Sequence, residues 1–94
     1  MYKYKSIDEI KKAHEAQGGH FFDPGWMRIY RSRIGRKVYR GQYFITSEQF
    51  ISMNEVEPRR YTVKKCVNGE ITTVGEFQQF ATRREAIKFI ETLK

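Results

Sequence analysis

The sequence predicts one α+β domain over residues 1–94. We expect a small antiparallel sheet of three to four strands, with N-terminal helices and a C-terminal helix packed on one face (α-α-β-β-β-β-α). Three observations predict this class: helical apolar spacing near both ends, period-two alternation in the middle, and the pair Asn68-Gly69. Asparagine and glycine accept the positive φ angles of a two-residue hairpin turn. A chain of 94 residues has the usual size of one domain.

The first helix is expected at about residues 7–17. Ser6 and Glu9 have the spacing of a capping box, in which each side chain accepts the backbone N–H of the other. Gly18-Gly19 ends the helix, because glycine accepts the left-handed conformation found after a helix. The inward positions at helical spacing are Ile7, Ile10, and Ala13 or His14.

A shorter second helix is expected at about residues 24–34. It begins at Asp23-Pro24, an N-cap followed by proline at the first helical position, and it stops at Gly35. One side of it carries Trp26, Met27, Tyr30 and Ile34. We expect Trp26, Tyr30 and Phe44 to be core residues.

The sheet is expected to begin after this helix. Residues 37–39 and 42–46 alternate and are two strands joined through Arg40-Gly41, or one strand bent at Gly41. Residues 52–58 are expected to form a loop. The strand over 61–67 places Tyr61, Val63 and Val67 on one face.

The chain is then expected to turn at Asn68-Gly69 and return as a strand from 70 to about 80, with Gly75 a bulge. Thr82 and Glu85 form a second capping box, which opens the last helix at about 83–93. Its inward residues are Ala86, Ile87, Ile90 and Leu93.

The net charge of +7 is concentrated in the middle of the chain. Residues 1–27 and residues 66–94 each carry four bases and four acids, whereas residues 28–65 carry ten bases and three acids. Residues 28–40 hold six bases and no acid. A local excess of this kind attracts polyanions or acidic protein faces.

Nucleic acid is the partner that this segment favours. Arginine binds phosphate with two parallel hydrogen bonds, and aromatic rings stack on unpaired bases. We therefore predict a basic face that contacts the phosphate backbone of DNA or RNA. An alternative is that the aromatics are core and the bases only a solvated surface. The predicted contact residues are Arg28, Arg31, Arg33, Arg36, Lys37, Arg40, Arg59, Arg60 and Lys64.

Catalysis and metal binding are not expected. His14, His20 and Cys66 are isolated and lack the spacing of zinc ligands, so no metal and no cofactor is predicted. His20 and Asp23 have the spacing of an oriented general base, but Asp23 fits a helix cap better. We expect a protein that is not an enzyme.

The location that the sequence predicts is the cytoplasm. The only cysteine cannot form an internal disulfide, and it is expected on a strand as a small hydrophobe or an exposed thiol. The N-terminal residues lack the pattern of a signal peptide. No apolar run approaches the roughly 18 residues of a membrane span, so no membrane binding is expected.

One set of motifs runs through nearly the whole chain. It comprises HFFDP at 20–24, MR at 27–28, RSRIG at 31–35, YFITSEQF at 43–50, RRYTV at 59–63 and TVGEFQ at 73–78. In this order the motifs resemble a family of short uncharacterised proteins carried by bacteriophages and mobile elements. The resemblance implies no activity and no site residues. It implies a genetic setting in which DNA handling and interference with host defence are common.

A local pattern adds a second resemblance. Residues 60–93 run strand, hairpin, strand and helix, and they resemble the arm-binding domains of phage-type integrases, which place a three-stranded sheet on DNA. They are also similar to the end of double-stranded-RNA-binding domains, although the first helix of those domains is missing here. Both resemblances imply nucleic-acid contact.

The alternative function is binding to another protein. In that case the same basic and aromatic face meets an acidic protein surface, since arginine and tyrosine are enriched at interface hot spots. In the setting implied by the resemblance, such a protein is an inhibitor of a host defence system, of the anti-CRISPR or anti-restriction type.

Overall fold

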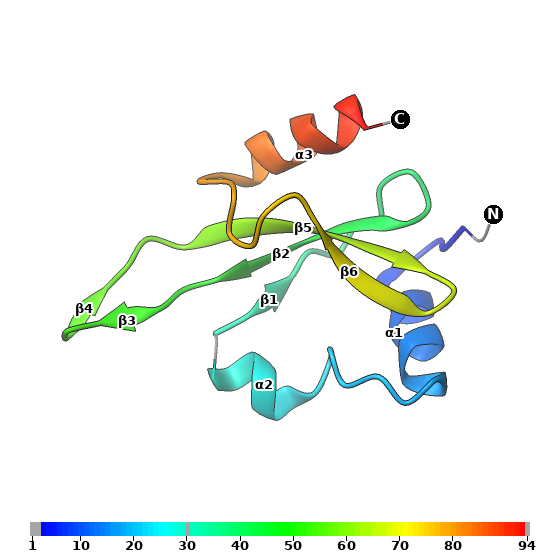
Figure 1. Ribbon diagram of the computed structural model, residues 1–94, viewed down its shortest axis with the longest axis horizontal. Helices are drawn as coiled ribbons and strands as arrows, with labels where there is room; N and C mark the ends of the chain where they lie inside the picture. The colour runs from blue at the N-terminus through cyan, green and yellow to red at the C-terminus, as the bar shows by residue number, and fades with distance from the viewer. Residues whose placement is uncertain (1–2, 30, 94) are drawn as a thin grey trace.

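The computed structural model describes residues 3–29 and 31–93. Its elements are α1 (Ile7–Ala16), α2 (Pro24–Ile29), β1 (Arg33–Ile34), β2 (Tyr43–Glu48), β3 (Ile51–Ser52), β4 (Glu55–Val56), β5 (Arg60–Val67), β6 (Glu70–Val74) and α3 (Arg83–Thr92) (Figure 1). Within these residues, four strands form an antiparallel sheet in the order β1-β2-β5-β6, and β3 pairs with β4. The predicted α+β class is confirmed.

The sheet is covered on both faces (Figure 1). One core lies between the sheet and α3, and its buried members are Tyr43, Ile45, Val63, Phe80, Ala86 and Ile90. The other lies between the opposite face and α1, and its buried members are Tyr4, Ile10, Phe22, Phe44 and Cys66. Because neighbouring residues of a strand point to opposite faces, β2 contributes to both cores. The sheet is therefore enclosed by helices from both sides, rather than carrying all of them on one face.

Ser6 and Thr82 each cap the start of a helix, as predicted. The backbone N–H of Glu9 donates to Ser6 Oγ at 3.3 Å, and Lys5 N–H donates to the Glu9 carboxylate at 3.1 Å. At α3, the backbone N–H of Glu85 donates to Thr82 Oγ1 at 3.2 Å. The predicted ends of these two helices agree with the structure to within one residue.

The second helix is shorter than the predicted 24–34. Asp23 caps it as expected, since its Oδ1 accepts from the Gly25 N–H at 2.7 Å. The helix ends at Ile29, and Arg31 has a φ of 49°. The chain then becomes β1 and pairs with the end of β2, which offers backbone partners that a continued helix would leave unused.

Only part of the predicted aromatic core is confirmed. Phe44 is fully buried. Trp26 is not a core residue: it is 54% exposed, and the short helix α2 that carries it has no buried residue. Tyr30 lies outside the described residues.

Arg40-Gly41 forms a tight turn between Tyr39 and Tyr43, with φ angles of 52° and 76°. Residues 37–39 contribute only an isolated bridge at Tyr39, so the predicted strand there is wrong.

A predicted loop holds a small hairpin. Strands β3 and β4 pair within residues 51–56, joined by Met53-Asn54 with φ angles of 48° and 69°. We call residues 51–56 the arm, which extends away from the body of the protein (Figure 1). Two-residue strands are too short to show an alternating pattern, and the turn lacks glycine.

The hairpin at Asn68-Gly69 is confirmed, with φ angles of 52° and 83°. The return strand β6 stops at Val74 instead of running to about 80, because Gly75 has a φ of 81° and turns the chain. Pairing resumes at Phe80, which bridges Tyr61.

Gly69 also lies against α1. A Cβ at this position would come within 2.6 Å of the Ala13 carbonyl oxygen. We expect Gly69→Ala to lower the free energy of unfolding by about 2–4 kcal/mol, through the left-handed backbone and this collision. Urea denaturation measures the change.

Gly18→Ala is the matched control, because Gly18 has a φ of 85° but no atom within 4 Å of the position of an added Cβ. We expect it to cost about 1 kcal/mol from the backbone alone. Equal losses at the two positions would contradict the contact with Ala13.

Candidate functional site

A basic groove opens between the N-terminal helices and the β1 edge of the sheet. It is a cavity of about 660 Å³ that receives positively charged side chains from separate parts of the chain. Among the described residues that line it there is no carboxylate. Its charged residues are Lys11, Arg28, Arg31, Arg33 and Arg59.

Arg59 is held firmly in this groove. One terminal nitrogen, Nη1, donates to the Ser47 carbonyl at 3.1 Å, to Ser47 Oγ at 3.0 Å and to the Arg31 carbonyl at 3.0 Å. Burial lowers the pKa of the Arg59 guanidinium, and the neighbouring charges of Arg33 and Arg31 lower it further. Like charges crowd here, so a bound anion would relieve their repulsion.

Two predicted contact residues have structural roles elsewhere. Arg60 donates from Nε to the Gln78 carbonyl at 2.8 Å and from Nη2 to the Gln79 carbonyl at 3.0 Å. Arg40 donates to the Ile90 and Leu93 carbonyls and so caps the end of α3. Both guanidinium groups therefore donate hydrogen bonds to backbone carbonyls of the protein itself.

Of the seven other predicted residues, four lie in the groove, two lie on the surface, and Lys64 lies in a separate pocket. Arg28, Arg31, Arg33 and Arg59 come together in the groove. Arg36 and Lys37 are on the connection from β1 to β2, outside the groove, and the Lys37 Nζ lies 5.4 Å from the centre of the Tyr39 ring. Sequence reasoning misses Lys11, which belongs to an N-terminal segment with no net charge.

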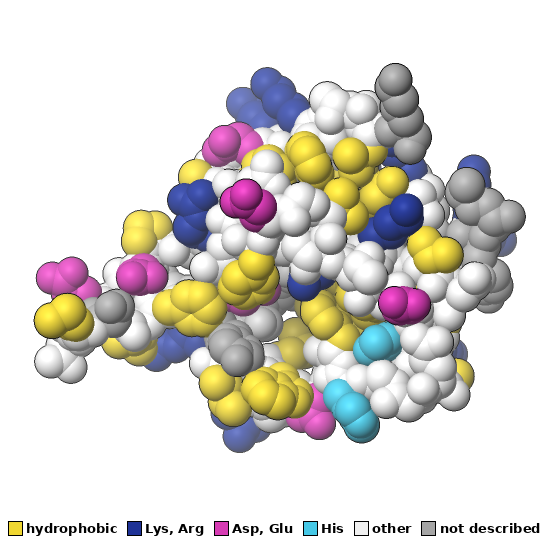
Figure 2. Space-filling view, viewed as in Figure 1, with side chains coloured by type: hydrophobic (Ala, Val, Ile, Leu, Met, Phe, Trp, Pro, Cys, Tyr) yellow, Lys and Arg dark blue, Asp and Glu magenta, His cyan; other side chains and the backbone are white. Residues whose placement is uncertain are grey.

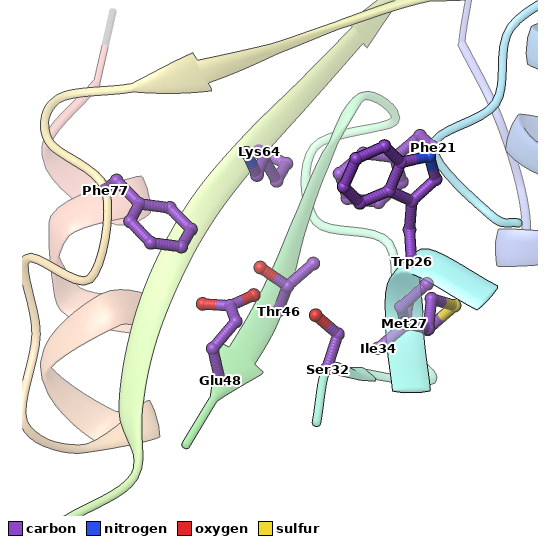
Figure 3. Close-up of a pocket in the computed structure, with 9 residues that line it drawn as sticks. All are labelled: Phe21, Trp26, Met27, Ser32, Ile34, Thr46, Glu48, Lys64 and Phe77. Atoms are coloured by element: carbon purple, nitrogen blue, oxygen red, sulfur yellow. The ribbon is translucent and has the colours of Figure 1, made fainter. Parts of the chain in front are cut away.

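An aromatic pocket of about 340 Å³ lies next to the groove. Figure 3 shows the residues that line the pocket. The two cavities share Met27 and Ser32 as lining residues. The pocket is lined by Phe21, Trp26, Met27, Ser32, Ile34, Thr46, Glu48, Lys64 and Phe77.

Trp26 and Phe77 stand on opposite sides of the aromatic pocket (Figure 3). Their side chains are 54% and 51% exposed. Phe21 is a fixed part of the wall, because it packs edge-on against Phe22 at 5.1 Å and Phe44 at 5.9 Å between ring centres. The pocket thus has a rigid base and two rings open to solvent.

Two oppositely charged side chains face the aromatic pocket. Glu48 is only 4% exposed, and burial raises the pKa of its carboxyl group against the opposing effect of Lys64. Thr62 Oγ1 donates to Glu48 Oε1 at 3.4 Å. Burial lowers the pKa of Lys64, a predicted phosphate contact that the structure places here instead. Titratable groups perturbed in a cleft are a mark of functional sites.

The Lys64 ammonium group is held among rings. Its Nζ donates to Thr73 Oγ1 at 2.7 Å and lies 5.3 Å from the centre of the Phe21 ring and 5.7 Å from that of Phe77. A cation over aromatic faces is attracted by their negative quadrupole.

Thr46 brings an unsatisfied hydroxyl to the pocket. Its Oγ1 is buried and, among the described residues, has no hydrogen-bond partner. The Thr46 hydroxyl lies close enough to the Glu48 carboxyl group to favour its charged form, which lowers the pKa of Glu48. The two groups are nevertheless not in hydrogen-bond geometry. Buried polar groups are nearly always paired, so this exception needs an explanation.

His14 fixes the segment that carries Phe21. The Phe21 N–H donates to His14 Nε2 at 3.1 Å, so the proton sits on Nδ1, which donates to the Gly69 carbonyl at 2.7 Å. One ring therefore ties α1, the pocket wall and the β5–β6 turn together.

The described residues contain no group of three or more histidine, cysteine, aspartate or glutamate side chains placed to hold a metal ion. Cys66 is buried, so it is a small hydrophobic core residue and not an exposed thiol. Over residues 3–29 and 31–93, no helix has the length and apolarity needed to cross a lipid bilayer.

A family model described as a family of unknown function (DUF7447) matches residues 6–91. The matched range includes every residue that lines the groove and the pocket. No curated protein and no solved structure matches the chain.

We expect His14→Ala to lower the free energy of unfolding by about 1–3 kcal/mol, because it leaves the Phe21 N–H and the Gly69 carbonyl without their partner. Thermal or urea unfolding measures it. His20 is exposed, so His20→Ala is the control and should change stability by less than about 0.5 kcal/mol. Equal effects of the two substitutions would contradict the bridging role.

Proposed function

Because the chain belongs to the DUF7447 family, whose function is not established, we propose a function from its own geometry. The protein binds the phosphate backbone of nucleic acid in the basic groove. The observation that carries this proposal is the convergence of Lys11, Arg28, Arg31, Arg33 and Arg59 on one cavity, with no carboxylate among its described lining residues.

The groove suits phosphates better than a merely solvated surface would. Surfaces of small domains usually intersperse both signs of charge, which keeps local potentials low. Here four separate segments, including α1 and α2, each bring a positive side chain to the same hollow. Arginine can donate two parallel hydrogen bonds to a phosphate, so several such residues position a charged strand. Contacts of this kind do not read base sequence.

The proposed contact set is narrower than the sequence predicts. Arg40 and Arg60 are engaged with backbone carbonyls, so we propose no phosphate contact for them. Arg36 and Lys37 lie outside the groove and at most extend it.

The proposed setting follows the resemblance noted in the sequence. We propose that the protein acts in the cytoplasm of a bacterial host on DNA or RNA of a phage or mobile element, by binding and without catalysis. The segment that resembles integrase arm-binding domains, residues 60–93, supplies no phosphate contact in this proposal, because Arg60 turns to the loop before α3 and Lys64 lies outside the groove.

A second candidate function is binding to a protein, such as a component of a host defence system. The arm favours it, since Met53 is 94% exposed and its neighbours Ile51 and Val56 are 52% and 58% exposed. Figure 2 shows hydrophobic and acidic side chains gathered where the arm projects. Glu55 in the arm and Glu57 directly after it repel phosphates, so the arm suits a protein surface better than a nucleic acid. The basic groove would then meet an acidic face of that partner.

Neutralising the groove tests the first candidate. We expect the triple variant Arg28→Gln, Arg31→Gln, Arg33→Gln to bind short DNA and RNA strands more weakly. The slope of log affinity against log salt concentration should fall by roughly 3, because three side chains that neutralise phosphates are removed. Fluorescence anisotropy at several salt concentrations measures both quantities.

The matched control is Arg83→Gln, Arg84→Gln, Lys88→Gln, which removes the same charge from exposed positions of α3. We expect its salt slope to stay within experimental error of the parent protein. If both triple variants bind equally weakly, net charge and not the groove governs binding, and the proposal is wrong.

The arm is tested by Met53→Asp, which places a charge at its most exposed apolar position. Under the second candidate function, a stoichiometric protein partner retained from nuclease-treated host lysate no longer co-purifies with Met53→Asp, while nucleic-acid binding is unchanged. Co-purification followed by light scattering measures this. Retention of the same partner by Met53→Asp would rule out the arm as its contact.

A further inference from the structure

We propose that the aromatic pocket receives one unpaired base of a single-stranded nucleic acid whose phosphates lie in the basic groove. This inference rests on the proposed function and names its substrate class. It assigns a role to the pocket residues, which phosphate binding alone leaves unexplained.

The shape of the pocket fits a flat aromatic ligand. Trp26 and Phe77 face the cavity from opposite sides, and both rings are about half exposed. Binding pockets for small ligands run from roughly 300 to 1,000 Å³, so a cavity of about 340 Å³ suits a small ring system. Every base has a π-face that can stack on such rings.

The polar groups of the pocket match the edge of a base. The Glu48 carboxylate is an acceptor, and the Lys64 ammonium group is a donor. A base edge presents both donors and acceptors, so it can pair with both. The Thr46 hydroxyl, buried and unpartnered among the described residues, is a further polar group at the same wall. Glu48 already accepts from Thr62 and Lys64 already donates to Thr73, but each can form further hydrogen bonds. A purely apolar ligand would use none of this capacity and would leave the Thr46 hydroxyl buried and unpaired, at a cost in free energy.

The position of the pocket points to a ligand that is both aromatic and anionic. Met27 and Ser32 line both the pocket and the groove, so the two cavities lie side by side at these residues. The positive side chains lie on the groove side, at Arg28, Arg31 and Arg33. A nucleotide has its base and its phosphate joined in this manner.

A duplex cannot satisfy this arrangement without opening. Bases in a duplex are stacked and paired, and they reach a pocket only after being turned out at an energetic cost. We therefore expect a preference for single strands over duplexes of the same length.

The test uses the fluorescence of Trp26, which is the only tryptophan of the chain. The parent protein is titrated with a single DNA strand of about 12 nucleotides, with an abasic strand of the same length, and with the matching duplex. The expected result is quenching of Trp26 by the base-carrying strand alone, and affinity for it that is roughly 5- to 100-fold higher than for the abasic strand. Anisotropy of a labelled strand measures the affinities independently of the quenching.

Two substitutions locate the effect. Phe77→Ala removes one exposed wall, and the base-carrying strand should then bind no better than the abasic one. Phe77→Tyr keeps the ring and should restore the preference, which separates loss of stacking from loss of folding. Val56→Ala shortens an exposed apolar side chain away from both cavities and should leave the preference unchanged.

The outcomes distinguish this inference from the proposed function. Equal, salt-sensitive binding of the base-carrying and abasic strands would overturn the pocket proposal and leave the groove proposal standing. No binding of any strand at low salt would overturn both. If the triple groove variant binds and is quenched by the base-carrying strand as strongly as the parent protein, the pocket takes the base without help from the groove, and the joint site is overturned.

Discussion

The central strand β2 is buried along its whole length, and the rest of the fold is arranged around that constraint. Its first residues, Tyr43 to Ile45, send apolar side chains alternately to the two faces of the sheet. Each face must then be covered, which α3 does on one side and α1 on the other (Figure 1). A chain this short has little apolar surface to spare, so both helices are needed to enclose the sheet.

The second half of β2 buries polar groups instead. Thr46, Ser47 and Glu48 are all buried, with exposed fractions of 1%, 5% and 4%. Ser47 is satisfied by Arg59, and Glu48 accepts from Thr62 beside Lys64. A buried carboxylate costs stability unless it is paired, and an apolar residue would avoid that cost. The buried polar side chains of Thr46 and Glu48 are therefore best explained by the pocket that they line, and they link the core to the proposed site.

The short helix α2 lies where the groove and the pocket meet. Trp26 and Met27 line the pocket, and Arg28 lines the groove. If the helix continued to residue 34, β1 could not pair with β2, and the backbone carbonyl of Arg31 could not accept a hydrogen bond from Arg59. Its early end thus brings an aromatic surface and a basic surface side by side. His14 adds to this order by fixing the loop that leads into α2.

Local features of the chain are predictable because they depend on neighbours within a few residues. The caps at Ser6, Asp23 and Thr82 and the turn at Asn68-Gly69 are hydrogen-bond and backbone preferences of this kind. The position of the charge excess is equally a property of the sequence. The arm escapes prediction because strands of two residues carry no period.

The sequence by itself determined the α+β class, the helix starts, the hairpin and the segment that holds the positive charge. Only the tertiary structure decided which charges act together. Long arginine side chains reach whichever carbonyls the packed elements leave open, so Arg40 and Arg60 bind backbone while Arg28, Arg31 and Arg33 remain in the groove. Lys11 joins them, and Lys64 turns to the pocket, because contacts between distant segments exist only once β2 has been enclosed.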